Sequence, residues 1–398
     1  MIEIEFSVIE EPSSALKELL EKFQKLHHVK VNIRPMSWKD AWSELLTCAL
    51  YGKGPDVSHI GSTWSSSLLA MNALRPFSIT EINKFGGSNA FHKACWQSCL
   101  DDGQTAFALP WEAYTHIILY RRELLQNAHV DEATAFKSAE SMERTLIDLQ
   151  ASGVETPLIL SIQGDLTGTL HRVSSWVWGA GGDYISPDGR RPLFGQPAAL
   201  KGMSAFFNLY RFLGPSVRSL SWPEMVNYFF TNDVAVAILG IKESYEWFMR
   251  KQTSTELLPE FGAAPMPGVP WVGGDNLVVW KHSLSYDHEQ VAVALASFLV
   301  DKAAQKEQTE YKNGGFIPTR QDALAALPYP ESRLTQAVHR TMELGRPYLG
   351  IGLWSKVENH LVMALDQVSQ DIIAGKEPVE AVQDNIVPLA QRLERTLS

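Results

Sequence analysis

The first 60 residues alternate between strand-like and helix-like apolar patterns, and this alternation limits the fold more than any other feature. Apolar residues occupy every second position over residues 2–9 and 29–33, which is typical of strands. They recur every three or four positions over residues 16–26 and 38–49, which predicts two helices. The turn GKGPDV then leads into a predicted short third strand at 56–60. This order is typical of βαβ units and predicts an α/β fold with a mostly parallel sheet.

Aromatic and polar residues stand where these three strands end. Glu11 follows the first strand, Trp38 follows the second, and Ser62 and Trp64 follow the third. Ligands of open α/β sheets gather at the carboxyl ends of the strands. We therefore expect these four residues to lie at one binding edge.

Length and charge exclude several classes of protein. A chain of 398 residues is too long for one hydrophobic core, so two domains are expected. The net charge of −10 argues against nucleic acid or an anionic membrane as partner, because both require clustered Lys and Arg. No apolar run approaches the roughly 20 residues that span a bilayer. The opening MIEIEFSVIEE lacks the basic and apolar regions of a signal peptide, so we expect either a processed chain or a protein that stays in the cell.

The cysteines predict neither a disulfide framework nor a metal site. Cys48, Cys95 and Cys99 are an odd number and cannot all pair within the chain. His92 shares a predicted helix face with Cys95 and Cys99, but three ligands from one helix make a poor tetrahedral site. We interpret this face as buried, and expect no metal and no cofactor.

The segment QTAFALPWEAYTHIILY, residues 104–120, combines strands with aromatic residues and a carboxylate. It predicts a short strand at 106–109, a stop at Pro110, which has no N–H to donate, and a second strand at 117–120. Trp111, Glu112 and Tyr114 fall between the two strands. An aromatic face meets the C–H face of a sugar, and a carboxylate accepts hydrogen bonds from its hydroxyls. The alternative is a strand end whose Trp and Tyr cap a core.

Later segments repeat this combination of aromatic residues, Gly and polar residues. Trp176 and Trp178 lead into a predicted turn that contains Gly182 and Asp183. A buried strand at 234–240 ends at Gly240, and a turn at 271–276 precedes a strand at 277–280. Helices are predicted from Pro197, over 288–300, and from Trp354 to a stop at Gly375.

Five segments resemble motifs of the extracellular solute-binding proteins of carbohydrate ABC importers, the family 1 class that includes maltose-binding protein. They are GPDVSHIGSTWSSSLLAMNALRPFS, FALPWEAYTHIILYRRELLQNAHVD, WVWGAGGDYISPDG, FTNDVAVAILG and NGGFIPTRQDAL, in the order of the family. The resemblance implies a type II periplasmic-binding-protein fold. In that fold two α/β lobes, each with a mixed, mostly parallel sheet, are joined by a hinge that the chain crosses three times.

Carried onto this sequence, the crossings lie near Leu109–Trp111, Phe261–Pro267 and Tyr311–Phe316. The N-terminal lobe is then residues 1–110 plus 265–312, and the C-terminal lobe residues 111–264 plus 313–398. The resemblance also implies a ligand cleft between the lobes that closes on binding, ABC permease subunits as partners, and a monomer.

The expected ligand-binding residues follow from both lines of argument. We expect stacking from tryptophans, hydrogen-bond acceptance by carboxylates, further hydrogen bonds from Tyr114, Asn276 and Ser62, and backbone approach at glycines, while Arg320 could meet an anionic ligand. The full set is Glu11, Trp38, Ser62, Trp64, Trp111, Glu112, Tyr114, Trp176, Trp178, Gly182, Asp183, Gly240, Trp271, Gly274, Asp275, Asn276 and Arg320. For each tryptophan, the alternative is a core or hinge position.

The sequence therefore predicts a non-catalytic protein that binds a mono- or oligosaccharide and delivers it to an importer. One alternative is a glycoside-processing enzyme, whose clefts also carry Trp and carboxylates. The chain has no GxSxG, HExxH or P-loop motif, and its carboxylates stand on separate segments. A second alternative is an intracellular sugar sensor on the same fold, which the missing signal peptide, the acidic start and the three cysteines favour. The expected location is periplasmic or on the cell surface for a processed chain, and cytoplasmic otherwise.

Overall fold

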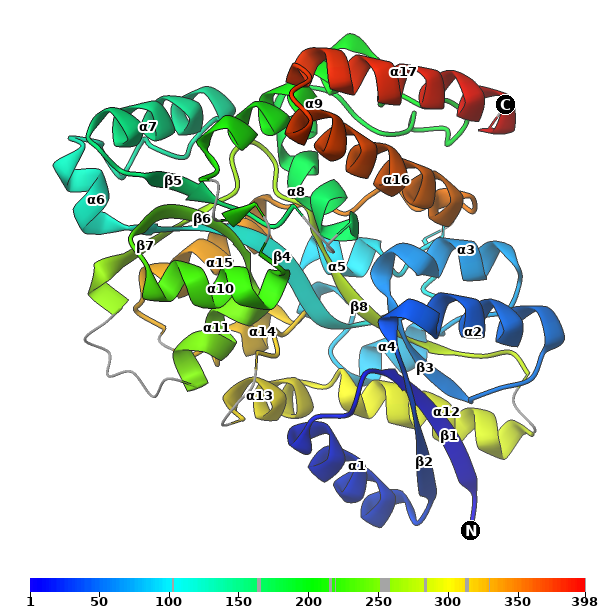
Figure 1. Cartoon of the computed structure of the whole chain (residues 1–398). Helices are drawn as coiled ribbons and strands as arrows, with labels where there is room; N and C mark the ends of the chain where they lie inside the picture. The colour runs from blue at the N-terminus through cyan, green and yellow to red at the C-terminus, as the bar shows by residue number, and fades with distance from the viewer. Residues whose placement is uncertain are drawn as a thin grey trace. The chain divides into compact units, whose positions relative to one another are not determined.

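The computed structural model describes residues 1–101, 104–162, 166–214, 217–218, 220–250, 258–282, 285–311, 315–328 and 330–397 (Figure 1). The chain divides into two compact units. Unit 1 comprises Met1–Tyr114, Gly273–Pro328 and Gly350–Ser355, and unit 2 comprises Thr115–Val272, Tyr329–Leu349 and Lys356–Ser398. Both units combine a β-sheet with helices, as an α/β fold requires.

Unit 1 begins with the predicted βαβ pattern. Its elements are β1 (Glu3–Ile9), α1 (Ser14–His27), β2 (Lys30–Met36), α2 (Trp38–Tyr51), β3 (Val57–Gly61), α3 (Ser65–Ala70), α4 (Ile79–Lys84), α5 (Lys93–Gln97), β8 (Val272–Val279), α12 (Tyr286–Leu299), α13 (Lys302–Glu310) and α14 (Gln321–Leu324). The sheet order is β2-β1-β3-β8, with β1 parallel to β2 and β3, and β8 antiparallel to β3. The first three strands and two helices are therefore confirmed.

Local chemistry explains why these elements form. Ser13 caps α1, because its Oγ accepts a hydrogen bond from the backbone N–H of Leu16 at 3.1 Å. Alternate residues of β1, among them Ile4 and Phe6, are buried against the apolar face of α1, which includes Phe23. Fully burying a side chain of this size contributes about 1.5–3 kcal/mol.

Unit 2 has a mixed sheet in which antiparallel pairs outnumber parallel ones among the described pairings. Its elements are the later part of β4 (Leu109–Arg121), α6 (Arg122–Asn127), α7 (Ala139–Ala151), β5 (Thr156–Ile159), α8 (Leu166–Gly179), α9 (Pro197–Phe207), α10 (Trp222–Thr231), β6 (Val234–Gly240), α11 (Ile241–Arg250), β7 (Phe261–Pro265), α15 (Arg333–Leu344), α16 (Trp354–Ile373) and α17 (Pro378–Leu397). β4 is antiparallel to both β6 and β7, whereas β5 is parallel to β6. The expectation of a mostly parallel sheet in this lobe is thus wrong, because β4 enters the unit against the direction of its neighbours.

Long helices cover much of unit 2. α9 packs closely on α8, where a side chain at Gly202 would lie 2.5 Å from the carbonyl oxygen of Trp176. α16 and α17 lie side by side as a hairpin, with Asn385 donating to Asp371 at 3.0 Å (Figure 1). The helices predicted from Pro197 and Trp354 are confirmed, and Gly375 has the positive φ, +101°, expected after a helix end.

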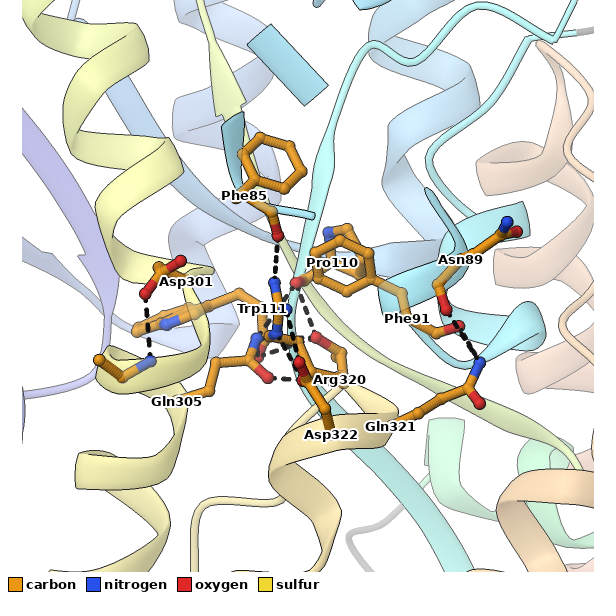
Figure 2. Close-up of polar contacts among 12 residues, drawn as sticks. Phe85, Asn89, Phe91, Pro110, Trp111, Asp301, Gln305, Arg320, Gln321 and Asp322 are labelled. Carbon is orange, nitrogen blue, oxygen red and sulfur yellow. Dashed lines mark hydrogen bonds and ion pairs between the residues drawn. The ribbon is translucent and has the colours of Figure 1, made fainter. Parts of the chain in front are cut away.

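Pro110 does not end a strand, contrary to the sequence prediction. It is the second residue of β4, which continues without a break to Arg121. Its carbonyl oxygen accepts a hydrogen bond from Thr319 Oγ1 at 2.8 Å, and Gln305 Nε2 donates to the next carbonyl, that of Trp111, at 2.9 Å (Figure 2). Buried side chains therefore satisfy the carbonyl oxygens at the start of β4.

Gly273 to Asn276 form part of a strand rather than the predicted turn. β8 runs through these residues and pairs with β3 from Asp275 onward. Gly274 has φ +122°, and a Cβ there would lie 2.1 Å from the carbonyl oxygen of Glu112. The glycine is needed because β8 lies directly against the backbone of β4 at this point.

The division into units differs from the lobe boundaries expected from the sequence. The first boundary falls after Tyr114 and the second after Val272. The third falls after Pro328 rather than at 312–313, residues that lie outside the described part of the chain. The segment after residue 314 joins unit 1 because its backbone pairs with β4, with Ala113 N–H donating to the carbonyl oxygen of Ile317 at 2.8 Å.

Replacing Gln305 with Leu should destabilise the protein. The change leaves the Trp111 carbonyl and the Arg320 N–H without the Gln305 amide, and each buried unsatisfied group costs about 1–3 kcal/mol. We expect a total loss of roughly 3 kcal/mol or more. Gln308 on the same helix is the matched control, because it is 3% exposed and its Nε2 has no hydrogen-bond partner among the residues that the structure describes. Urea denaturation should show a lower midpoint for Q305L and no loss for Q308L, and equal midpoints would contradict this account.

Candidate functional site

A cluster of three tryptophans lies at the carboxyl edge of the unit 1 sheet. Trp38 begins α2, directly after the N-cap Ser37, and Trp64 lies in the helical turn that follows β3. The ring centroids are 5.6 Å apart for Trp38 and Trp64, and 5.4 Å apart for Trp42 and Trp64. Trp38 is 45% exposed, and the other two are half-buried. We call these three residues the tryptophan cluster, and it offers an accessible aromatic surface.

A histidine and a carboxylate stand next to the tryptophan cluster. His59, on β3, makes an edge contact with Trp38, with 6.1 Å between the ring centroids. Its Nε2 lies 3.2 Å from Oδ2 of Asp275, which pairs with Gly61 in the sheet. The Asp275 side chain is 15% exposed. The structure therefore brings the predicted residues Trp38, Trp64 and Asp275 together.

Trp111 and Arg320 belong to the interior of unit 1. The Trp111 ring is 4% exposed and packs against Phe6, His59 and Phe316. Arg320 is also 4% exposed; it donates to the Phe85 carbonyl at 2.5 Å and forms an ion pair with Asp322 (Figure 2). Neither side chain presents a face to a ligand in this structure, so both have packing roles.

Other predicted residues of unit 1 have structural partners. Asn276 is buried, and its Nδ2 donates to Ser65 Oγ at 3.0 Å and to Ser98 Oγ at 3.1 Å. Ser62 and Glu112 are buried, and Glu112 forms an isolated β-bridge with Pro318. Tyr114 is half-buried, and Gly274 serves the approach of β8 to β4. Glu11 is exposed.

Unit 2 contains an aromatic cluster formed by segments far apart in the sequence. His171 on α8 stacks face to face on Trp271, with 3.6 Å between the centroids and parallel rings. Tyr348 approaches Trp271 at 6.0 Å and Trp178 at 5.7 Å, and Tyr184 approaches Tyr348 at 5.5 Å. These five residues are called the unit 2 aromatic cluster. A parallel bridge between Trp271 and Arg346 brings the two later segments together.

Polar groups fix the unit 2 aromatic cluster. His171 Nδ1 lies 2.8 Å from the Tyr348 hydroxyl, and Ser174 Oγ lies within 3.0 Å of the hydroxyls of both Tyr184 and Tyr348. Burial raises the pKa of both tyrosines above the usual value for a phenol. Both phenols therefore keep their protons at neutral pH and can donate hydrogen bonds.

An arginine and a carboxylate border this cluster. The Arg346 guanidinium lies 4.4 Å from the centroid of the Trp178 ring and donates to Asp183 Oδ2 at 2.6 Å. The Trp178 indole N–H donates to the other oxygen of Asp183 at 3.1 Å. The side chains of Arg346 and Asp183 are 40% and 33% exposed. Both keep hydrogen-bonding capacity toward solvent or a ligand.

The remaining predicted residues of unit 2 have packing roles. Trp176 lies on α8 rather than in a turn, is buried, and makes an edge contact with Phe206. Gly182 lies so close to α9 that a Cβ would be 2.6 Å from the backbone of Ala199. Gly240 is buried at the end of β6.

Sequence reasoning missed four residues that complete these clusters. His59, His171, Arg346 and Tyr348 were not among the predicted site residues. His59 is the only basic residue within β3, and a charged or titratable group in a buried strand is a usable signal. Arg346 and Tyr348 stand in the Gly- and Pro-containing segment GRPYLGIG, which is typical of a loop.

The chemistry of the described residues gives no metal centre. No group of three or more His, Cys, Asp or Glu residues suited to a metal ion occurs in that part of the chain. The three cysteines are free and buried, and burial raises the pKa of Cys95 to about 12 and that of Cys99 well above its usual value. Within the described ranges, no helix combines the length and apolar character needed to cross a bilayer.

Comparison with known proteins identifies the family. The chain matches the family model of bacterial extracellular solute-binding proteins over residues 18–337, and it belongs to this family. It is therefore a non-catalytic solute-binding protein of an ABC transporter. A search of curated protein sequences finds no match.

Solved structures show the same fold over the full chain. The sugar-binding protein MalE from Xanthomonas citri has a TM-score of 0.81 and 20% identity, covering 99% of this chain and 97% of its own. A solute-binding protein from Thermotoga lettingae bound with α-D-tagatose has a TM-score of 0.79 and 16% identity, with full coverage of both chains. A substrate-binding protein from Listeria monocytogenes in complex with cycloalternan has a TM-score of 0.78 and 17% identity, covering 100% and 99%. The predicted periplasmic-binding-protein fold is confirmed.

Two tryptophans of unit 1 should respond differently to truncation. Trp111→Ala removes a buried ring and should cost about 3–5 kcal/mol of stability. Trp38→Ala removes a half-exposed ring and should cost under about 1 kcal/mol. Urea denaturation of both variants measures the difference. A large loss for Trp38→Ala would show that the tryptophan cluster is part of the core instead of an accessible surface.

Proposed function

We propose that this protein binds a neutral carbohydrate, either a mono- or an oligosaccharide, in a cleft between its two lobes. The lobes close by hinge motion, and the loaded protein delivers the sugar to the permease subunits of an ABC importer. The observation that carries this proposal is the accessible tryptophan cluster beside the Asp275 carboxylate. Aromatic faces stack on the C–H faces of sugar rings, and carboxylate oxygens accept hydrogen bonds from hydroxyls.

The proposed contacts use a subset of the residues expected from the sequence. In unit 1 they are Trp38, Trp64 and Asp275, with Glu11 at the edge. In unit 2 they are the exposed parts of Asp183 and Arg346, whereas the rings of Trp178 and Trp271 beside them are buried and support these two side chains. Buried residues with packing roles, such as Trp111, Trp176 and Asn276, are not proposed as contacts.

The bound ligands of the structural relatives support the class of ligand. α-D-tagatose and cycloalternan differ greatly in size, but both are rich in hydroxyl groups and carry no charge. Each hydroxyl can donate one hydrogen bond and accept others. This matches a site that offers both carboxylate acceptors and guanidinium donors.

We further propose a periplasmic or cell-surface location, in keeping with an extracellular family. The cysteine content favoured an intracellular sensor, but all three thiols are buried and free. Burial raises the pKa of each thiol, so little reactive thiolate is present at neutral pH. Such cysteines are tolerated in an oxidising compartment, so the cysteine content does not favour an intracellular sensor.

A thermal-shift screen tests the proposed function. The purified protein is heated with maltose, D-tagatose, ribitol and glucuronate, each in separate samples. A sugar at about 100 times its Kd should add roughly 2.7 kcal/mol of stability, which raises the melting temperature by several degrees. A response to a neutral sugar or polyol without its turnover supports the proposal. A response to none of the neutral compounds contradicts it.

Removing Trp38 should weaken the binding of whichever neutral compound gives the response. Loss of one stacked ring is worth about 0.5–1.5 kcal/mol beyond burial, or roughly a 2- to 13-fold rise in Kd. Trp96→Ala is the matched control, because Trp96 is half-buried and stacks on Phe91 outside the cluster. Isothermal titration calorimetry should show weaker binding for Trp38→Ala only. Equal affinities for the two variants would remove the tryptophan cluster from the site.

A further inference from the structure

His59 occupies a fixed position between the core of unit 1 and the tryptophan cluster. It is 5% exposed and lies on β3, where the neighbouring residues are buried. Its ring makes edge contacts with Trp111 on one side, at 4.9 Å, and with Trp38 on the other, at 6.1 Å. The ring therefore cannot turn without displacing two larger rings.

The hydrogen bonds of His59 define its tautomer. The backbone N–H of Ile9 donates to His59 Nδ1 at 3.1 Å. A ring nitrogen that accepts a hydrogen bond carries no proton, so the single proton of the neutral ring resides on Nε2. Protonating Nδ1 would place two N–H groups against each other in a buried site.

The Nε2–H group faces Asp275. Nε2 and Asp275 Oδ2 are 3.2 Å apart, a distance at which an N–H group and a carboxylate oxygen can form a hydrogen bond. Within the described residues, the Asp275 carboxylate makes no other side-chain hydrogen bond or ion pair. Most of its lone pairs are therefore available to other donors.

The backbone around Asp275 is equally constrained. Gly274 holds β8 against β4, and Asp275 pairs with Gly61 across the sheet. A carboxylate on such a backbone retains one main freedom, the rotation of its side chain. The His59 Nε2–H is the group that restricts this rotation.

We infer that His59 is a positioning residue, which in its Nε2–H tautomer holds Asp275 in the orientation that accepts ligand hydroxyls. This inference rests on the proposed function. A neutral histidine suits the task, because it orients the carboxylate without cancelling its charge. The ligand then meets a full negative charge beside an aromatic surface, and binding requires no reorganisation of the side chain.

The first test uses the ligand-free protein. Nitrogen NMR of the ¹⁵N-histidine-labelled chain, with His59→Gln to assign the signals, should show an unprotonated Nδ1 and a protonated Nε2 for His59. Asp275→Asn should shift the Nε2 signal and leave Nδ1 close to its original position. A protonated Nδ1 would overturn the inference whatever sugar the protein binds.

The second test is a double-mutant cycle with maltose, D-tagatose and ribitol as separate probes. His59→Leu and Asp275→Asn should each weaken binding of the responding probe by about tenfold, and the double variant should be no weaker than either single variant. His59→Gln can accept from Ile9 and donate to Asp275, so it should stay within about threefold of wild type. Additive losses in the cycle, or wild-type affinity for His59→Leu, would overturn the inference.

The two tests separate this inference from the proposed function. If wild type binds none of the three probes, the proposed function fails, and the NMR result alone decides whether His59 positions Asp275. Melting temperatures of all variants identify any that fail to fold. In that case the two nearly isosteric variants decide: Asp275→Asn should lose about tenfold in affinity while His59→Gln stays within about threefold of wild type, and the opposite order would overturn the inference.

Discussion

The rest of unit 1 depends on how the chain supplies hydrogen bonds to the backbone at Pro110. A proline in a strand has no N–H to donate, and Pro318, which bridges to Glu112, has none either. The side chains of Thr319 and Gln305 donate to the carbonyl oxygens of Pro110 and Trp111, and the Gln305 oxygen accepts from the Arg320 N–H at 3.1 Å (Figure 2). Both the nitrogen and the oxygen of the Gln305 amide are therefore hydrogen-bonded. Because β4 runs on from this point into unit 2, one buried side chain secures the start of a strand that both units share.

The same network reaches the proposed site through packing. The Trp111 carbonyl is held by Gln305, and the Trp111 ring contacts His59, which contacts Trp38 and faces Asp275. These contacts lead from the buried rings of Trp111 and His59 to the exposed ring of Trp38. Under the proposed function, Trp111 would support the site without contacting the ligand. The sequence predicted Trp111 as a residue that stacks on a ligand, but its ring is buried beneath the tryptophan cluster.

The parts of the structure that the sequence predicted are those set by local chemistry. The βαβ order and the positions of Trp38 and Trp64 follow from periodicity and from where strands end. The parts it did not predict depend on residues far away in the chain. The Pro110 carbonyl accepts from Thr319, 209 positions away, and the stack of His171 on Trp271 joins α8 to a later segment. Burial depth is likewise non-local, so Trp111 and Trp38 could not be distinguished by their neighbours in sequence.

Under the proposed function, the hydrogen-bonding groups of the two units restrict the class of ligand more than their aromatic residues do. Unit 1 offers acceptors, since Asp275 uses one contact with a neutral histidine and Glu11 is exposed. Unit 2 offers a guanidinium that gives one donor to Asp183 and keeps others accessible. An anionic ligand would pair with the guanidinium and be repelled by the carboxylates. A cationic ligand would pair with the carboxylates and be repelled by the guanidinium. Under the proposed function, a hydroxyl group can donate to a carboxylate such as Asp275 and accept from a guanidinium such as that of Arg346, so a neutral polyhydroxylated ligand suits both kinds of group.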